Sequence, residues 1–209
     1  MKSIAILITA FNRKDKTLTC LQSLYQQQSG DFYFDIYLVD DGCTDGTPQE
    51  IRKIYPEVNI ISGDGTLFWC RGMYKAWETA VQVNNYDYYL WLNDDTLTYP
   101  YMLKVLTECA TVYHDEAIIV GSTCSSDHTQ TTYGGRVGGG KLTSQNKKVE
   151  EIHYFNGNIV LIPRQVYQTL GNLDYYFTHS KGDFDYGLRA HKAGIKMYQA
   201  GGGDLGECD

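Results

Sequence analysis

The sequence predicts a single α/β domain built on a doubly wound parallel sheet with helices on both of its faces. Short β-branched or aromatic runs alternate with amphipathic helix patterns through residue 121, as they do in βαβ units. The most apolar of these runs lies in Tyr86–Thr96 (YDYYLWLNDDT) and indicates a strand that is buried on both faces and ends in acidic residues. A chain of 209 residues is also long enough for one domain with a substantial core.

Five strands are expected in the first part of the chain, each bounded by turn residues. In order they are Ser3–Thr9, Tyr33–Val39, Val58–Ile61, the apolar part of Tyr86–Thr96, and Ala117–Gly121. Helices between them follow from apolar residues at helical spacing, and a capping box at Thr47–Glu50 marks the start of the second helix. The residues expected to face inward from these helices are Leu18, Leu21, Leu24 and Tyr25; Ile51 and Ile54; Met73, Ala76, Trp77, Ala80 and Val81; and Met102, Val105, Leu106, Cys109 and Val112.

The second part of the chain differs from the first in composition. Ser122–Glu151 is polar and rich in glycine, which indicates a loop or an irregular hairpin. The elements expected beyond it are a strand at Asn158–Ile162, helices at Pro163–Leu170 and Lys181–Ala193, and a last strand at Ile195–Gln199. Phe184 and Leu188 are expected to face inward from the second of these helices. We therefore expect one domain over residues 1–209, made of one half at 1–121 and another at 122–209.

Bulk properties exclude several classes of partner. The formal net charge is −7 and the pI is about 5.2, so no basic face is available to neutralise nucleic-acid phosphates. Six cysteines occur without a CxxC pair, which favours reduced thiols over a zinc site or a disulfide framework. No apolar run reaches the length of a membrane span, and the first strand begins almost at the first residue, which leaves no room for a targeting segment before it. These features predict a soluble domain in the cytoplasm.

Acidic residues gather at the ends of expected elements. The three pairs are Asp40/Asp41, Asp94/Asp95 and Asp183/Asp185. The first two pairs follow strands, and the carboxyl ends of parallel strands form the edge at which open α/β sheets bind ligands. Adjacent carboxylates repel each other unless a cation or a donor lies between them, and their hard oxygens suit Mg²⁺ or Mn²⁺. For any one pair a turn or a helix N-terminus remains the alternative, whereas three pairs in these positions favour a ligand crevice.

Five segments across nearly the whole chain point to a known family. In order they are ILITAFNR, IYLVDDGCTDGT, LWLNDDT, FNGNIVLIPR and KGDFDYGLRAHKAG. Their order and spacing resemble those of the inverting, family 2 glycosyltransferases, and GDGTLFWCRGMYKA is similar to the rhamnosyltransferase-like branch. The resemblance implies a GT-A fold, which is a Rossmann-like, doubly wound, mostly parallel central sheet flanked by helices, with a small C-terminal part on the acceptor side. It also makes residues 1–121 the nucleotide-binding half and 122–209 the half that carries the acceptor site and the catalytic base.

The resemblance implies contacts with a nucleotide-diphosphate sugar donor at five positions outside the metal motif. Thr9 and Phe11 match positions that contact the nucleoside, with the aromatic ring near the base. Asp41 matches the carboxylate that accepts a hydrogen bond from the base or the ribose, and Asp40 lies beside it. Arg71 matches a position at which several relatives also touch the nucleotide.

The resemblance also places a metal and a catalytic base. A sugar nucleotide leaves as a diphosphate, so a divalent cation, Mn²⁺ or Mg²⁺, stabilises the charge that develops on bond cleavage. Asp95 matches the metal ligand, and Asp94 matches the residue that contacts the ribose or the sugar of the donor. Asp183 matches the base that takes the proton of the incoming hydroxyl in a single displacement, and Asp185 is the second acid of the same helix. On the acceptor side, Asn156 and Gly157 match the segment that borders the saccharide or lipid-linked saccharide acceptor.

Two features depart from the family pattern. The family usually has Glu-Asp where this chain has Gly182-Asp183, so one supporting acid is missing while the base is retained. The chain also ends at Asp209 without a QxxRW-type motif, and many relatives carry a third metal ligand, often His, and acceptor-binding helices beyond this point. A truncated domain, a minimal enzyme and an inactive relative are the three interpretations of this ending.

The resemblance therefore implies a metal-dependent inverting glycosyltransferase of hexosyltransferase type, and analogy with the family implies a role in cell-surface polysaccharide synthesis. A sugar nucleotidyltransferase is the first alternative, but it would carry a glycine-rich loop after the first strand, and TAFNRKD has no glycine. A catalytically impaired remnant that still binds nucleotide sugars is the second, and slow donor hydrolysis would argue against it. A lipid-linked acceptor would bring the chain to the inner face of a membrane as a peripheral protein, although no basic amphipathic helix marks such an association.

Overall fold

The computed structural model describes residues 1–28, 30–143 and 148–209, and within them the main sheet has eight strands. The strand order is β10-β13-β6-β12-β4-β1-β2-β3. The strands are β1 (Lys2–Ala10), β2 (Phe32–Asp40), β3 (Asn59–Ser62), β4 (Tyr88–Leu92), β6 (Ile118–Val120), β10 (Glu150–Glu151), β12 (Ile159–Pro163) and β13 (Met197–Gln199). Only β10 and β12 run against the others among these eight, which confirms the predicted mostly parallel, doubly wound sheet.

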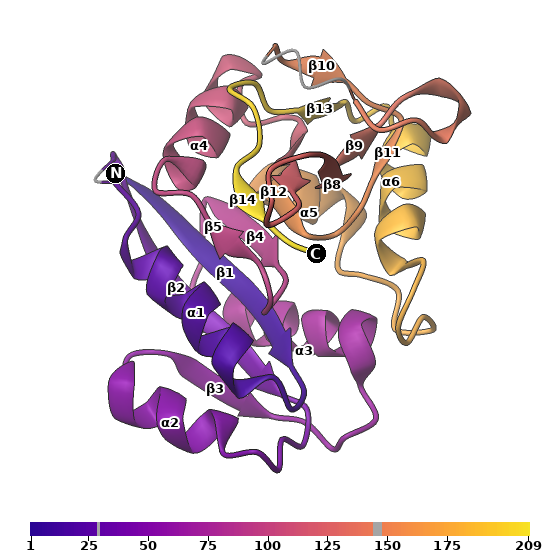
Figure 1. The fold of residues 1–209 in the computed structure, drawn as a ribbon. Helices are drawn as coiled ribbons and strands as arrows, with labels where there is room; N and C mark the ends of the chain where they lie inside the picture. Colours follow the sequence, from indigo (N-terminus) through magenta and orange to yellow (C-terminus); the bar gives the residue numbers. More distant parts are fainter. Residues whose placement is uncertain (29, 144–147) are drawn as a thin grey trace.

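Helices cover both faces of this sheet, because successive residues of its strands point to opposite sides. In β1, for example, Ile4, Ile6 and Ile8 enter one core and Ala5 and Leu7 enter the other. The first core contains α1 (Lys14–Tyr25), α2 (Thr47–Ile54) and α4 (Met102–Val112), and the second contains α3 (Phe68–Val83), α5 (Arg164–Leu170) and α6 (Gly182–Lys192). In Figure 1 the indigo and purple elements form the lower part of the molecule, and α6 lies at the upper right.

Smaller sheets surround the carboxyl end of β4. One has the order β5-β14-β7-β8, and the other pairs β11 with β9. Their strands are β5 (Leu97–Thr98), β7 (Thr123–Cys124), β8 (Thr131–Tyr133), β9 (Gly135–Arg136), β11 (Tyr154–Phe155) and β14 (Gly206–Glu207), with a short 3-10 turn η1 at Gly138–Gly140. The predicted irregular hairpin within Ser122–Glu151 is the bulged pair β7 and β8, while residues 144–147 of that segment lie outside the described residues. The yellow β14 runs back beside β5 (Figure 1), so the last residues lie near the end of β4.

The predicted inward face of α6 is wrong. Phe184 and Leu188 are 41% and 44% exposed, and the buried side of the helix instead carries Tyr186 and Ala190. The ring of Tyr186 packs against Trp91, with the ring centroids 5.1 Å apart. The large aromatic core on this face of the sheet therefore determines which side of α6 is buried. The inward orientation expected for Tyr25, Ile54 and Val112 is also wrong, because all three are exposed and each is the last residue of its helix.

The predicted capping box at the start of α2 is also wrong. The helix begins after Gly46, whose φ of +84° is one that glycine adopts at little cost. Asp45 does the capping instead, because its carboxylate accepts the backbone N–H of Thr47 at 3.0 Å and the Thr47 hydroxyl at 2.6 Å. Thr47 is therefore the first residue of the helix and the donor in these bonds.

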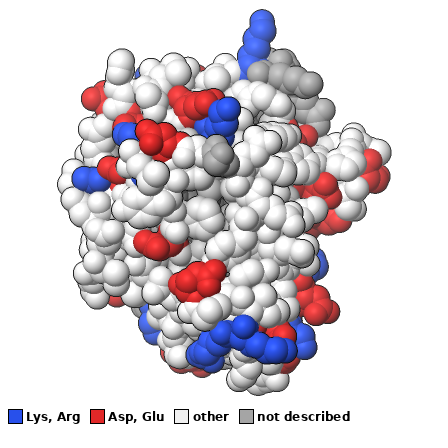
Figure 2. All heavy atoms as spheres, turned by 90° about the vertical axis from the view of Figure 1, so that its left-hand side faces the viewer, with Lys and Arg blue, Asp and Glu red and all other residues white. Residues whose placement is uncertain are grey.

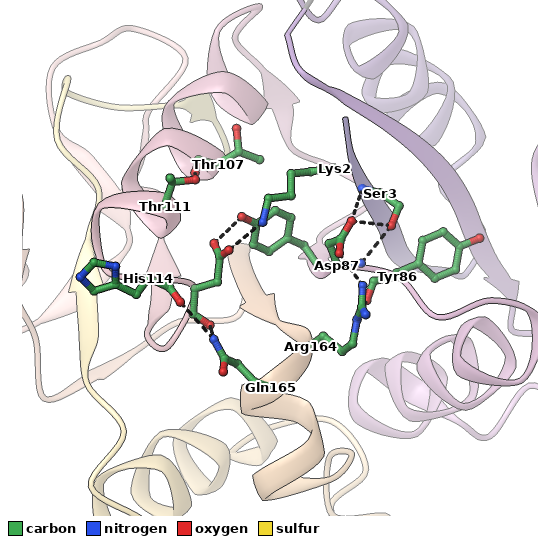
Figure 3. Close-up of polar contacts among 11 residues, drawn as sticks. Lys2, Ser3, Tyr86, Asp87, Thr107, Thr111, His114, Arg164 and Gln165 are labelled. Carbon is green, nitrogen blue, oxygen red and sulfur yellow. Dashed lines mark hydrogen bonds and ion pairs between the residues drawn. The ribbon is translucent and has the colours of Figure 1, made fainter.

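Polar side chains at the amino end of the sheet form hydrogen bonds and ion pairs with one another. Figure 3 shows Asp87 accepting from the backbone N–H and the hydroxyl of Ser3, at 2.9 and 3.0 Å, and pairing with Arg164. Beside them, Lys2 Nζ pairs with Asp115 at 2.7 Å. These carboxylates hold β1, β4 and α5 together, so we assign a structural role to this edge of the sheet.

Replacing Asp87 with asparagine should lower the free energy of unfolding at pH 7 by about 1–3 kcal/mol, because charged hydrogen bonds are lost. Burial alone would raise the pKa of Asp87, but the Ser3 donors, Arg164 and Lys2 hold this pKa below its ordinary value. A lowered pKa in the folded state gives stability that is present above the unfolded pKa of about 3.9 and is lost as the pH falls through the folded value. Urea unfolding at pH 7 and at acidic pH measures both effects.

The matched control for that experiment is Asp31→Asn. The Asp31 carboxylate is exposed, and among the described residues its one ion pair is with the amino terminus. Its effect on stability should be close to zero. If Asp87→Asn were equally neutral, the polar cluster at the amino end of the sheet would not hold the strands together.

The surface carries mixed charge. On the face shown in Figure 2, Lys and Arg side chains are interspersed with Asp and Glu over a mostly uncharged surface, apart from a small basic group at one end. Within the described ranges, none of the helices combines the length and the apolar character that crossing a bilayer requires.

Candidate active site

Two adjoining cavities open at the carboxyl end of the parallel strands. The larger has a volume of about 790 Å³ and the smaller about 200 Å³. Arg13, Trp69, Asp94 and His179 belong to the walls of both. The larger cavity therefore joins the end of β4 to the start of α6, and the smaller one reaches the ends of β1 and β2.

Asp94 and Asp95 lie where the sequence predicts, directly after β4, and both face the larger cavity. Asp94 is only 6% exposed, and burial, partly offset by Arg13, raises the pKa of its carboxyl to about 6. Its Oδ2 accepts from the Thr17 hydroxyl at 3.2 Å. Asp95 Oδ2 accepts from Arg13 Nη1 at 2.7 Å, and its Oδ1 accepts from the Cys208 thiol at 3.5 Å.

These two carboxylates form a donor set that suits a hard divalent cation. The Arg13 guanidinium stands in for such a cation, because its Nη1 lies 3.5 Å from Asp94 Oδ1 as well as 2.7 Å from Asp95 Oδ2. No group of three or more His, Cys, Asp or Glu side chains in the described ranges is arranged to hold a metal. A cation at this position would therefore complete its shell with substrate oxygens and water, which is how Mg²⁺ commonly binds.

Asp183 faces the same cavity from the first turn of α6. Its Oδ1 accepts the N–H of Phe184 at 2.8 Å, and its Oδ2 accepts the N–H of Gly157 at 3.0 Å. Burial raises the pKa of this carboxyl above its ordinary value, although both N–H donors act in the opposite direction. Each oxygen keeps a free lone pair, so Asp183 is a fixed carboxylate of increased basicity that can still accept a proton.

Gly182 explains one departure from the family pattern. A Cβ atom at this position would lie 2.3 Å from Cys70 Sγ, which is closer than any real contact allows. The helix start therefore packs directly on α3, and a glutamate at residue 182 would not fit beside Cys70 without a shift. The presence of Cys70 at this contact therefore accounts for glycine, in place of glutamate, at residue 182.

Gly157 is required by the walls of the cavity. A Cβ atom added here would lie 2.6 Å from the Trp69 ring and 3.4 Å from the Asp183 Cβ. Trp69 is itself fixed, because its Nε1–H donates to Asn93 Oδ1 at 2.8 Å. Gly157→Ala should therefore displace Trp69 or Asp183.

We expect Gly157→Ala to lower turnover at least tenfold with a smaller loss of stability, since misplacement by about 1 Å can cost a hundredfold in rate. Steady-state kinetics and thermal unfolding measure the two effects. Gly138→Ala is the matched control, because an added Cβ there meets nothing within 4 Å. Unchanged turnover in Gly157→Ala would show that this wall of the cavity plays no part in the reaction.

The smaller cavity contains three of the residues predicted to contact a nucleoside, which are Thr9, Phe11 and Asp41. Phe11 is exposed, whereas Asp41 is almost fully buried. The Asp41 carboxylate accepts the N–H groups of Gly65 at 2.9 Å, Leu67 at 3.0 Å and Phe68 at 2.9 Å. It thus fixes the turn that leads into α3, whose first residue, Phe68, has a φ of +54° and lines the same cavity.

Three other predicted site residues are absent from the described linings of both cavities. Asp40 Oδ1 accepts the N–H of Cys43 at 2.8 Å and fixes the loop after β2. Arg71 donates through Nε to the Tyr175 carbonyl at 3.0 Å, and its guanidinium lies 4.9 Å from the centre of the Tyr175 ring. Asp185 pairs with Arg189 at 2.9 Å within α6. These contacts support the loops and the helix around the cavities.

The acceptor-side residues Asn156 and Gly157 do line the larger cavity, between β11 and β12. Asn156 Oδ1 accepts from Arg136 Nε at 3.2 Å, which connects this turn to β9. Further lining residues that the sequence did not single out for this cavity are Arg136, Tyr154 and Phe184. The rings of Tyr154 and Phe184 meet edge to face, 5.2 Å apart between centroids.

Arg13 and Trp69 are the most informative residues that sequence reasoning did not assign to the site. Arg13 is the last residue of the matched segment ILITAFNR, so its place in that motif was the available signal. Trp69 belongs to the walls of both cavities. His179 also lines both cavities, and its ring packs edge to face on Phe68.

Comparisons with known proteins concern the family and the fold. The model of the family described as Glycosyl transferase family 2 matches residues 5–171. Three structures of S. aureus TarS 1–349 are similar at 14% identity over 100% of this chain: TM-score 0.73 for the one without a named ligand, 0.72 with UDP and 0.72 with UDP-GlcNAc. The chain spans 60%, 60% and 58% of the length of those chains, so the likeness concerns the fold. No curated protein sequence matches.

Proposed function

The chain belongs to glycosyl transferase family 2, and from this premise we propose that it transfers a sugar from a nucleoside diphosphate donor to a hydroxyl group of an acceptor, with inversion. One observation carries the proposal: Asp94 and Asp95 after β4, and Asp183 at the start of α6, face a single cavity. The family model supports sugar transfer, and the TarS complexes with UDP and UDP-GlcNAc make these the first ligands to test.

In the proposed complex the nucleoside occupies the smaller cavity. Thr9 and Asp41 would contact the base or the ribose there, and the exposed rings of Phe11 and Phe68 offer stacking surfaces. Asp41 has already used most of its acceptor capacity on the turn before α3, so its main contribution would be to shape the cavity. We propose supporting roles for Asp40 and Arg71, which hold neighbouring loops through backbone contacts.

The diphosphate would then lie across the boundary of the two cavities, next to Asp94 and Asp95. A divalent cation, Mn²⁺ or Mg²⁺, held by Asp95 would neutralise the charge that builds up on the leaving diphosphate. Asp94 would accept from the ribose or the sugar of the donor. In the free protein, burial raises the pKa of this carboxyl to about 6.

Asp183 would act as the general base. The acceptor hydroxyl oxygen forms a bond to the anomeric carbon, the bond from that carbon to the diphosphate oxygen breaks, and the hydroxyl proton moves to Asp183. The N–H groups of Gly157 and Phe184 hold the carboxylate in place, and its raised pKa increases its affinity for the proton. One displacement of this kind inverts the anomeric carbon and needs no covalent intermediate.

The acceptor would enter beside Asn156 and Gly157, where Tyr154 and Phe184 provide apolar ring surface for a saccharide. In this scheme residues 1–121 mainly bind the nucleotide, and residues 122–209 supply the base and part of the acceptor wall. Asp185 would contribute by fixing α6 through Arg189. Synthesis of a cell-surface polysaccharide, on a free or lipid-linked saccharide, is the setting that we propose for the reaction.

Incubation with a panel of sugar nucleotides and Mn²⁺, beginning with UDP-GlcNAc, tests the proposal. We expect slow release of the nucleoside diphosphate from one donor, and nuclear magnetic resonance of the released sugar should show the inverted anomer. A remnant that only binds donors would release none. A sugar nucleotidyltransferase would instead release pyrophosphate from a nucleoside triphosphate and a sugar 1-phosphate, and either of these results would contradict the proposal.

A further inference from the structure

Arg13 covers the acidic pair at the end of β4. Its side chain is 51% exposed, whereas those of its two partners, Asp94 and Asp95, are only 8% and 12% exposed. Among the described residues it is the one cationic side chain that pairs with either carboxylate. A cation that is itself open to solvent and lies over two nearly buried anions can leave without any rearrangement of the core.

The position of Arg13 is incompatible with simple addition of a metal. Asp95 Oδ2 already accepts from Arg13 Nη1, and Asp95 Oδ1 accepts from the Cys208 thiol. A divalent cation that binds Asp95 on the cavity side would compete with the guanidinium for the same oxygen and would be repelled by its charge. Metal binding therefore requires Arg13 to move.

The walls of the cavities indicate where Arg13 would move. Its side chain lines both the smaller cavity and the larger one, so it lies at the boundary that a bound diphosphate would cross. A planar guanidinium matches the geometry of phosphate oxygens and binds them through paired hydrogen bonds. A diphosphate would thus offer Arg13 a new anionic partner at the moment when the metal takes the old one.

We propose that Arg13 is a tethered cation that occupies the metal position in the free protein and is transferred to the diphosphate when metal and donor bind together. This inference rests on the proposed function, because it requires a diphosphate ligand. It makes binding of the two ligands cooperative: metal alone must displace Arg13 without compensation, whereas metal with diphosphate gives Arg13 a partner. By linkage, the diphosphate must then raise the affinity for metal by the same factor as metal raises the affinity for diphosphate.

Loss of Arg13 should act in opposite directions on the two ligands. Without the guanidinium, Asp94 and Asp95 remain as an uncompensated acidic pair, so metal alone should bind more tightly. The diphosphate, in contrast, should lose a charged partner, so its contribution to metal binding should shrink. Arg13 precedes α1 without capping the helix through its side chain, so the substitution leaves the helix start intact.

Mn²⁺ titration followed by electron paramagnetic resonance of the free ion tests the inference. We expect Arg13→Gln to bind Mn²⁺ alone about tenfold more tightly than the native chain, because a like charge a few ångströms away is removed. UDP, GDP, ADP, CDP and dTDP are then added separately, and the increase in Mn²⁺ affinity that the best of them produces should fall about tenfold in the variant. Arg13→Lys keeps the charge but not the paired hydrogen bonds of the guanidinium, so it should bind Mn²⁺ alone with close to native affinity and keep only part of the diphosphate effect. Arg52→Gln, which removes a charge from the exposed side of α2, should behave as native.

Each result decides one question. If Arg13→Gln binds Mn²⁺ alone no more tightly than the native chain, or if Arg13→Lys binds Mn²⁺ alone as tightly as Arg13→Gln does, Arg13 does not act as a tethered cation. If none of the five diphosphates raises the Mn²⁺ affinity of the native chain, the proposed function is contradicted, and so is the transfer of Arg13 to a diphosphate. Circular dichroism of the variants confirms that they are folded.

Discussion

Replacing Asp183 with asparagine is expected to lower the rate of sugar transfer by about 10²–10⁴-fold, the usual contribution of a general base. Asparagine keeps an oxygen that can accept one of the N–H groups of Gly157 and Phe184, but it takes no proton from the acceptor. Affinity for the nucleoside diphosphate should remain within about twofold of native. The substitution removes an interaction that forms only in the transition state, so it lowers the rate and leaves ground-state binding intact. Transfer rates and nucleotide binding are measured on the same preparation.

The control for this substitution is Asp31→Asn, which makes the same chemical change at an exposed site far from the cavities. The native rate should also decrease as the pH falls through the raised pKa of Asp183, since only the ionised carboxylate can accept the proton. If Asp183→Asn retained full transfer, Asp183 would not be the general base, and another group would have to take the proton.

Replacing Asp95 with asparagine is expected to weaken Mn²⁺ binding by at least about tenfold, since the site would lose an anionic oxygen ligand. Diphosphate binding that depends on Mn²⁺ should weaken with it. This effect is opposite in sign to that of Arg13→Gln, although both residues belong to the same ion pair. The pair of variants therefore separates a metal ligand from a residue that competes with the metal.

Mn²⁺ titration of the native chain and of Asp95→Asn, with and without the nucleoside diphosphate, measures this difference. Asp31→Asn again serves as the control for removal of one negative charge. Equal Mn²⁺ affinity in the native chain and in Asp95→Asn would show that Asp95 is not a metal ligand.

The main sheet was predictable because its longer strands are continuous apolar runs. β1 and β4 are buried on both faces, and such runs stand out against the polar helix surfaces around them. The smaller sheets were not predictable, since strands of two residues such as β5, β9 and β14 are too short to show any periodicity. The inward face of α6 was misassigned because packing against the aromatic core, rather than the apolar pattern of the helix, decided it.

The acidic part of the site could be predicted, and its surroundings could not. Asp94 and Asp95 follow a strand that the pattern identifies clearly, and Asp183 begins a helix whose motif resembles that of the family. The place of Arg13 depends on β1 pairing with β4, which sets the residues after the two strands side by side. The position of Trp69 depends on where α3 begins. Asp41, which is far from Trp69 in the sequence, fixes that start by accepting the N–H groups of Leu67 and Phe68.

Thermal unfolding of the native chain with the five nucleoside diphosphates, with and without Mn²⁺, tests whether the cavity at the end of β4 binds a nucleotide donor. A ligand present at about a hundred times its dissociation constant stabilises the folded state by about 2.7 kcal/mol, which is a readily measured increase in Tm. We predict that one diphosphate raises the Tm in the presence of Mn²⁺ and has a much smaller effect without it. If none of the diphosphates raises the Tm under either condition, the cavity at the end of β4 does not bind a nucleotide donor, and only the fold and the family would remain.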